Sequence, residues 1–167
     1  MDPASASFSG MNWLGLGLAF VANLVIGFIW YAPWFPTGAA WVRMQGMDPK
    51  NMPKAPGGEM AKSMVLGMLI GPLLMLFVFT HDFWVYLDAF RNTATGGKAG
   101  YKLSIMDGIM GGVFTWLGFI VPLNLNSVAF DRKPWKLFFI NTGYYLITLV
   151  VAGILLVTVG KFTLPSA

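Results

Sequence analysis

Long apolar runs separated by short polar stretches dominate the pattern along this chain. A helix that crosses a membrane needs about 20 mostly apolar residues. Four segments reach that length, at roughly residues 12–31, 61–80, 103–124 and 137–159. The runs do not alternate between apolar and polar positions, which excludes membrane β-strands. Because backbone groups in lipid must bond within their own segment, we expect an all-α integral membrane protein, a bundle of four helices.

The residues after the second run follow a different pattern. Phe83, Leu87 and Phe90 recur at helical spacing among charged residues. This amphipathic pattern predicts a short interfacial helix near residues 82–92 that lies along the membrane surface. The stretch TATGGKAG that follows is rich in small residues and predicts the end of that helix.

The composition is that of a membrane protein. Hydrophobic residues make up 56% of the chain and charged residues 11%, whereas a soluble domain has about 25% charged residues. The length of 167 residues fits one domain. We place it at residues 11–160, after an N-terminal extension of residues 1–10 and before a C-terminal tail of residues 161–167. The net charge of +4 is scattered, and no basic run indicates a nucleic-acid partner.

The distribution of Lys and Arg predicts an orientation. Seven of these residues lie in or beside the connections 32–60 and 125–136, and four lie on the opposite side. The positive-inside rule therefore places these connections on the cytoplasmic or matrix-equivalent side of a bacterial or organellar inner membrane, with both termini opposite. The first ten residues hold no Lys or Arg, so we interpret the first run as a retained helix and not as a targeting signal.

Small residues recur at four-residue spacing within the runs. Helices in lipid associate through such residues because they allow the backbones to approach closely. We expect them to pack helices within the bundle, with a dimer interface as the alternative. The candidates are Gly15, Ala19, Gly27, Gly67, Gly71, Gly108 and Gly112.

Polar residues in or near the apolar runs are the candidates for chemistry: Asn23, His81, Asp82, Asp107, Asn126 and Asn141. Asn23 lies near mid-membrane, so we expect its amide to bond a neighbouring helix. His81, Asp82 and Asp107 should share one side of the membrane because consecutive helices run antiparallel. They form either a proton relay or weak metal site, or a group of side chains in hydrated headgroups.

No motif in the sequence specifies an enzyme. The chain has no cysteine and a single histidine, which excludes thiolate sites and bis-histidine haem ligation. Neither a Walker loop nor an HExxH motif is present. We therefore expect a non-enzymatic protein without a metal or cofactor.

Aromatic and basic residues gather on the side of the connections 32–60 and 125–136. Trp and Tyr favour the membrane interface, and Lys and Arg keep their charge at headgroup level. One interpretation is simple anchoring. The other is a lipid phosphate held by Arg132 and Lys136 beside an aromatic wall, which requires the stretch GFIWYAPWFPTGAAW to face that turn. The candidates are Trp30, Tyr31, Trp34, Trp41, Arg132, Lys133, Trp135 and Lys136.

Several of these stretches also occur together in a known family. MNWL at Met11, then GFIWYAPWF, WLGFIVP and FDRKPWKLFFINTGYYL give the chain its likeness. From about Met11 to Thr158 it resembles the small four-helix membrane proteins catalogued as domain of unknown function 1761. The resemblance implies a four-helix membrane fold and no established reaction.

These observations together favour a non-enzymatic role. We expect an accessory or structural subunit of a larger membrane complex, or a lipid-contacting module. Its partners would be membrane lipids and other membrane-protein subunits. The alternative is a small transporter or channel for protons, ions or a small molecule, because several polar residues lie in or near the membrane.

Overall fold

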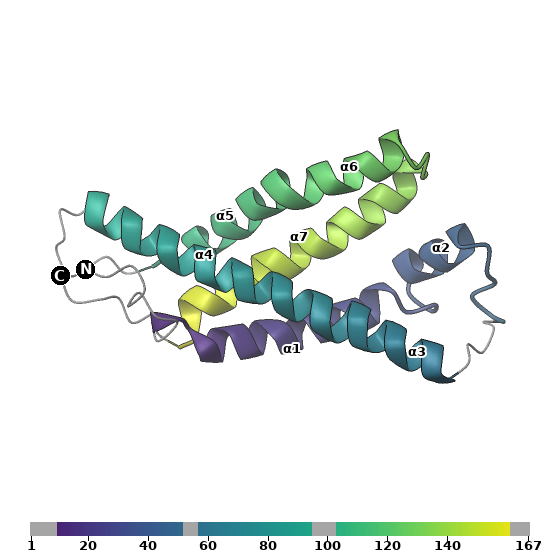
Figure 1. The fold of residues 1–167 in the computed structure, drawn as a ribbon, viewed down its shortest axis with the longest axis horizontal. Helices are drawn as coiled ribbons and strands as arrows, with labels where there is room; N and C mark the ends of the chain where they lie inside the picture. The colour runs from purple at the N-terminus through teal and green to yellow at the C-terminus, as the bar shows by residue number, and fades with distance from the viewer. Residues whose placement is uncertain (1–9, 52–56, 95–102, 161–167) are drawn as a thin grey trace.

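The computed structural model describes residues 10–51, 57–94 and 103–160, and regular structure in these ranges is helical throughout (Figure 1). Four of its helices are long and apolar enough to cross a membrane. They are Trp13–Trp30, Val65–Phe83, Ile105–Ala129 and Trp135–Thr158. The expectation of an all-α protein with four membrane spans is therefore confirmed. The predicted N-terminal extension, apart from Gly10, and the predicted C-terminal tail lie outside the described residues.

Several of the helices follow one another without a break. In chain order they are α1 (Trp13–Trp30), α2 (Pro36–Met44), α3 (Gly57–Met64), the π-helical η3 (Val65–Ile70), α4 (Gly71–Ala94), α5 (Ile105–Thr115), the π-helical η4 (Trp116–Ile120), α6 (Val121–Ala129) and α7 (Trp135–Thr158). No break separates α3, η3 and α4, or α5, η4 and α6. Two of the four spans therefore contain a π-helical segment.

The separate interfacial helix predicted near residues 82–92 is not formed, because α4 continues through this stretch to Ala94. No glycine or proline lies between Pro72 and Gly96 to end the helix earlier. At 1.5 Å per residue the continuous rod 57–94 is about 57 Å long, which exceeds the hydrocarbon thickness of about 30 Å. The rod must therefore tilt or extend beyond the hydrocarbon layer.

Prolines account for the two π-helical segments. η3 ends at Ile70 and η4 at Ile120, and Pro72 and Pro122 follow each end by two residues. A proline lacks the N–H group, and its ring clashes with the carbonyl four residues earlier. Widening the helix to i→i+5 bonding before the proline relieves that clash.

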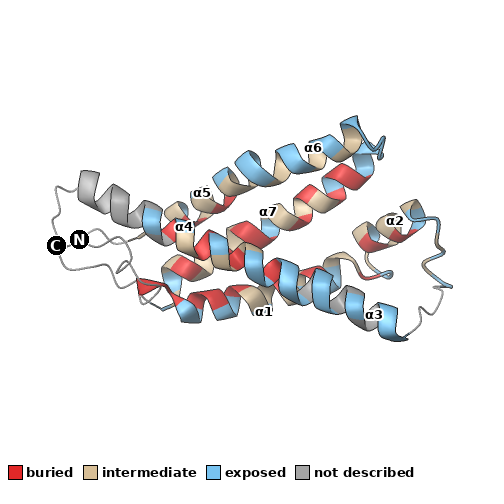
Figure 2. Ribbon diagram, in the orientation of Figure 1, coloured by how far each residue is buried: buried red, intermediate tan, exposed pale blue. Residues whose placement is uncertain are grey.

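α7 is the central helix of the bundle. It packs along α5 on one side and along α1 on the other, whereas α4 lies mainly against α1 (Figure 1). Within an 18-residue apolar window of each span, 44% of the residues are buried in α7, against 11% in the α5–α6 span (Figure 2). The apolar core forms where α1, α4 and α7 meet, from Leu16, Ala19, Leu76, Phe79, Phe83, Leu149, Ala152 and Leu156.

Glycines bring the backbones of α5 and α7 into direct contact. A Cβ atom on Gly108 would lie 2.5 Å from the carbonyl oxygen of Gly153, and one on Gly112 would lie 2.6 Å from that of Leu149. These distances leave no room for a methyl group without separating the helices. Gly108 and Gly112 thus lie where helix packing was expected, and Gly153 is their partner on α7.

The other predicted glycines divide into two groups. A Cβ atom on Gly15 or Gly27 would meet an α7 side chain at 3.0 Å and 3.2 Å, respectively, so both allow close packing of α1. Gly67 and Gly71 do not meet another helix of the bundle, and their alternative role in a dimer interface stays a prediction. A Cβ on Gly67 would meet open space, and one on Gly71 would approach only Leu66 of its own rod, at 3.3 Å. The α3–η3–α4 rod contacts its neighbours through larger side chains.

Candidate functional site

Asn12 links the start of α1 to the end of α7. It caps α1, where its Oδ1 accepts a hydrogen bond from the Gly15 N–H at 2.8 Å. Its Nδ2 donates to the carbonyl oxygens of Leu156 at 2.9 Å and Val159 at 2.6 Å, near the end of α7. The sequence analysis did not single out Asn12, although an Asn just before a helix is a known capping signal.

Near the middle of the bundle, the side chains of Asn23 on α1 and Tyr144 on α7 form a hydrogen bond. Asn23 is only 1% exposed, and its Oδ1 accepts a hydrogen bond from the Tyr144 hydroxyl at 2.6 Å. About two turns along α1, the Tyr31 hydroxyl donates to Asn141 Oδ1 at 3.2 Å. Two of the predicted polar residues, Asn23 on α1 and Asn141 on α7, therefore lie in a single polar strip where these two helices meet. Asn126, a third, is exposed on α6.

The aromatic residues at the end of α1 divide into inward and outward groups. Trp30 Nε1 donates to the Ile140 carbonyl at 3.0 Å. The Tyr31 ring makes edge contacts with the rings of Trp41 at 5.7 Å and Tyr144 at 5.2 Å between centroids. Trp34, in contrast, is 68% exposed. Burial and hydrogen bonding fix the inward group on α7, and Trp34 is placed as an interface anchor would be.

The basic turn between α6 and α7 remains apart from these aromatics. It lies at the same end of the bundle as α2 (Figure 1). Arg132, Lys133 and Lys136 are exposed, and the Lys133 Nζ lies 3.7 Å from the Asp131 carboxylate. Within the described ranges, no hydrogen bond or ion pair joins Arg132 or Lys136 to α1 or α2. Trp135 packs on Phe138 and Phe139 of its own helix. Direct bonds therefore do not join the two predicted halves of the phosphate site, and that site stays a prediction.

His81, Asp82 and Asp107 are positioned by local bonds. The His81 Nδ1 lies 3.2 Å from Asp82 Oδ1, and the two side chains are 39% and 69% exposed. Asp107 Oδ2 accepts from both the backbone N–H and the hydroxyl of Ser104, each at 2.8 Å, in a capping box that starts α5. Asp107 thus lies at the start of α5, whereas His81 and Asp82 are partly exposed residues in the middle of α4.

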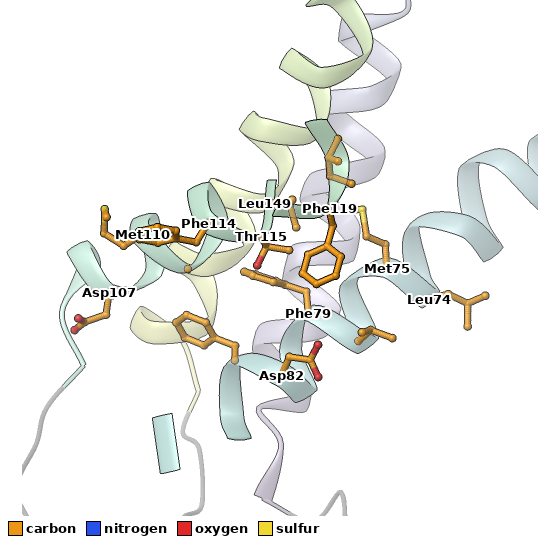
Figure 3. A pocket seen from close by; sticks show the side chains of 14 residues that line it. Leu74, Met75, Phe79, Asp82, Asp107, Met110, Phe114, Thr115, Phe119 and Leu149 are labelled. Carbon is orange, nitrogen blue, oxygen red and sulfur yellow. The ribbon is translucent and has the colours of Figure 1, made fainter. Parts of the chain in front are cut away.

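Asp82 and Asp107 nevertheless border the same groove, between α4 and the α5–η4 segment (Figure 3). The groove has a volume of about 820 Å³, and Leu149 of α7 lies at its floor. Asp107 lies at one edge of the groove, Asp82 lies at another edge below Phe79, and Leu74 lies on the side away from Asp107 (Figure 3). The remaining lining is apolar except for one hydroxyl: Met75, Val78, Phe79, Phe83, Met110, Gly111, Phe114, Thr115, Ile120 and Leu149.

A smaller cavity of about 130 Å³ lies between α1, η3 and α7. Polar side chains form much of its wall, and we call it the polar cavity. Both the groove and the polar cavity border a π-helical segment. Phe119 and Ile120 of η4 line the groove, and Gly67 of η3 lines the polar cavity. Such segments frequently occur at functional sites. The wall of the polar cavity consists of Asn23, Leu24, Gly27, Tyr31, Gly67, Tyr144 and Tyr145.

Comparison with known proteins gives one match. A family model described as "Protein of unknown function (DUF1761)" matches residues 14–157. No curated protein and no solved structure gives a match to this chain. The matched residues include every residue that lines the groove and the polar cavity.

Proposed function

We propose that this chain, which belongs to the DUF1761 family of proteins of unknown function, is a non-enzymatic membrane protein that holds one lipid in the groove between α4 and α5. The observation that carries the proposal is the groove's combination of size and lining. Its volume of about 820 Å³ lies within the range of about 300–1,000 Å³ typical of ligand sites. Its long apolar wall suits a hydrocarbon chain.

The polar residues at the rim of the groove supply a preference for the headgroup. Asp82 and Asp107 border the groove, and no Lys or Arg is among the lining residues. His81 lies beside Asp82, at 3.2 Å. Carboxylates near the membrane surface attract an amine and repel an anionic headgroup. A lipid with an amine-bearing headgroup therefore fits this groove better than an anionic lipid with the same chains.

Replacing Val78 with Trp is expected to block lipid binding in the groove. Val78 lines the groove on α4 and is 53% exposed. An indole at this position displaces at least two methylenes of a bound chain, each worth about 0.8 kcal/mol, so lipid retention should fall about tenfold. Native mass spectrometry, after exchange into detergent with equal phosphatidylethanolamine and phosphatidylglycerol, measures the lipid retained per protein.

Val25→Trp is the matched control, because Val25 is 54% exposed on α1 and does not line the groove. It should retain lipid as the unmodified protein does, with phosphatidylethanolamine preferred. Equal lipid retention by the two Trp variants would show that the groove binds lipid no better than any other lipid-facing surface. Loss of the headgroup preference alone would remove the role given to the carboxylates.

Transport is less well supported as a function. A path for ions or protons needs polar groups through the full depth of the membrane. The polar strip extends from Tyr31 and Asn141 to Asn23 and Tyr144, and the apolar core lies beyond it along α1 and α7. That core opposes a continuous polar path. The role of an accessory subunit stays a prediction, and co-purification from the native membrane tests it.

A further inference from the structure

The polar cavity is a second candidate binding site, separate from the lipid groove. It lies on the other side of the bundle's core from α5, among α1, η3 and α7, and has a volume of about 130 Å³. No charged residue lines it. Because an ion would lose its hydration there without gaining a counter-charge, the cavity suits an uncharged occupant.

The side chain of Asn23 in the wall offers that occupant a hydrogen-bond donor. The Asn23 oxygen accepts from the Tyr144 hydroxyl, but its Nδ2 carries two more N–H groups. Asn23 is 1% exposed, and among the described residues the structure shows no hydrogen bond from this Nδ2. Among the described residues, Thr148 Oγ1 is the only buried side-chain nitrogen or oxygen without a partner, so the Asn23 Nδ2 is open to the cavity that Asn23 lines. The amide of Asn23 therefore calls for an acceptor inside the cavity.

Three tyrosines and one glycine set the shape of the site. The rings of Tyr31 and Tyr145 pack against that of Tyr144, with centroids 5.2 Å and 5.0 Å away. They give the cavity aromatic walls that suit a small apolar or ring-shaped body. On the opposite wall, a Cβ atom on Gly67 would meet nothing within 4 Å. Gly67 is exposed, so the cavity opens sideways beside η3.

We propose that this cavity binds a small uncharged carbonyl compound whose oxygen accepts a hydrogen bond from the side-chain amide of Asn23. A carbonyl supplies the acceptor that Asn23 lacks, and the tyrosine rings contact the rest of the molecule. The lateral opening at Gly67 admits such a molecule from the bilayer, where uncharged carbonyl compounds partition. The proposal does not depend on the lipid groove.

Solid-state NMR of the protein in bilayers tests this site, with cyclohexanone labelled with ¹³C at the carbonyl as the probe and with ¹⁵N-labelled asparagine in the protein. We expect one saturable bound carbonyl signal with a dipolar contact to an asparagine side-chain nitrogen. Asn23→Leu should remove that contact and weaken binding about tenfold, as expected for the loss of one buried hydrogen bond.

Further variants separate binding from folding. Gly67→Leu fills the opening and should weaken binding to a similar extent, while Gly118→Leu should not, because Gly118 also faces open space but lies in η4. Tyr144→Phe removes the bond to Asn23 and keeps the amide, so it should retain the contact. An unsaturable signal, equal binding by Gly67→Leu and Gly118→Leu, or an Asn23 amide in contact with water only would overturn the proposal.

Discussion

Gly108→Ala is expected to lower the free energy of unfolding by about 1–3 kcal/mol, the usual cost of inserting a methyl group into a packed contact. The new Cβ would lie 2.5 Å from the Gly153 carbonyl oxygen and 3.0 Å from the Ile154 nitrogen. Both are backbone atoms of α7, so no side-chain rotation can relieve the clash. Denaturation by SDS in mixed micelles, followed by circular dichroism, measures the loss.

Gly118→Ala is the control for the intrinsic effect of replacing glycine in a helix. A Cβ on Gly118 meets nothing within 4 Å, and alanine favours helix over glycine by up to about 1 kcal/mol. This variant should be as stable as the unmodified protein or more so. If both variants had the same stability, α5 and α7 would not be in backbone contact.

Asn12→Ala is expected to cost about 3 kcal/mol. The change removes a helix cap worth about 1 kcal/mol, and it also removes two hydrogen bonds to the Leu156 and Val159 carbonyls, worth about 1 kcal/mol each. Asn12 is 2% exposed, so these groups would stay buried without their partner. The same unfolding measurement tests the loss.

Asn12→Ser resolves the two contributions. A serine can still cap the Gly15 N–H, but its side chain is too short to reach both carbonyls, so we expect about two thirds of the full loss. Asn126→Ala replaces an exposed asparagine and should change stability by less than about 0.5 kcal/mol. Equal stabilities for the Ala variants at positions 12 and 126 would contradict the link between α1 and α7.

The four spans could be predicted because length and apolar character alone define them. The continuation of α4 beyond the second span could not, since charged residues after Thr80 indicate exit from lipid but do not end a helix. Glycine and proline are the strongest helix-breaking residues, and the first of them after Pro72 is Gly96. Pro72 and Pro122 give a local signal for the π-helical segments, which the sequence analysis did not use.

The candidate sites depend on contacts between distant residues, so the sequence indicated them only in part. Gly67–Gly71 and Gly108–Gly112 have the same spacing, yet only the second pair meets another helix, because spacing does not determine which face is buried. Asn23 could be predicted to bond a neighbouring helix, but not that Tyr144 would be its partner. The groove likewise depends on residues that are distant in sequence, because α4, α5, η4 and Leu149 of α7 all line it.

The central position of α7 has a consequence for biosynthesis. This helix leaves the ribosome after the other three spans, and both α1 and α5 pack on it. Until it is inserted, the glycine surfaces of these earlier helices face lipid or the insertion machinery, so the native bundle cannot close. We therefore expect a nascent chain arrested before Trp135 to show no cross-link between engineered cysteines on α1 and α5, and the full chain to form its contacts in a single late step.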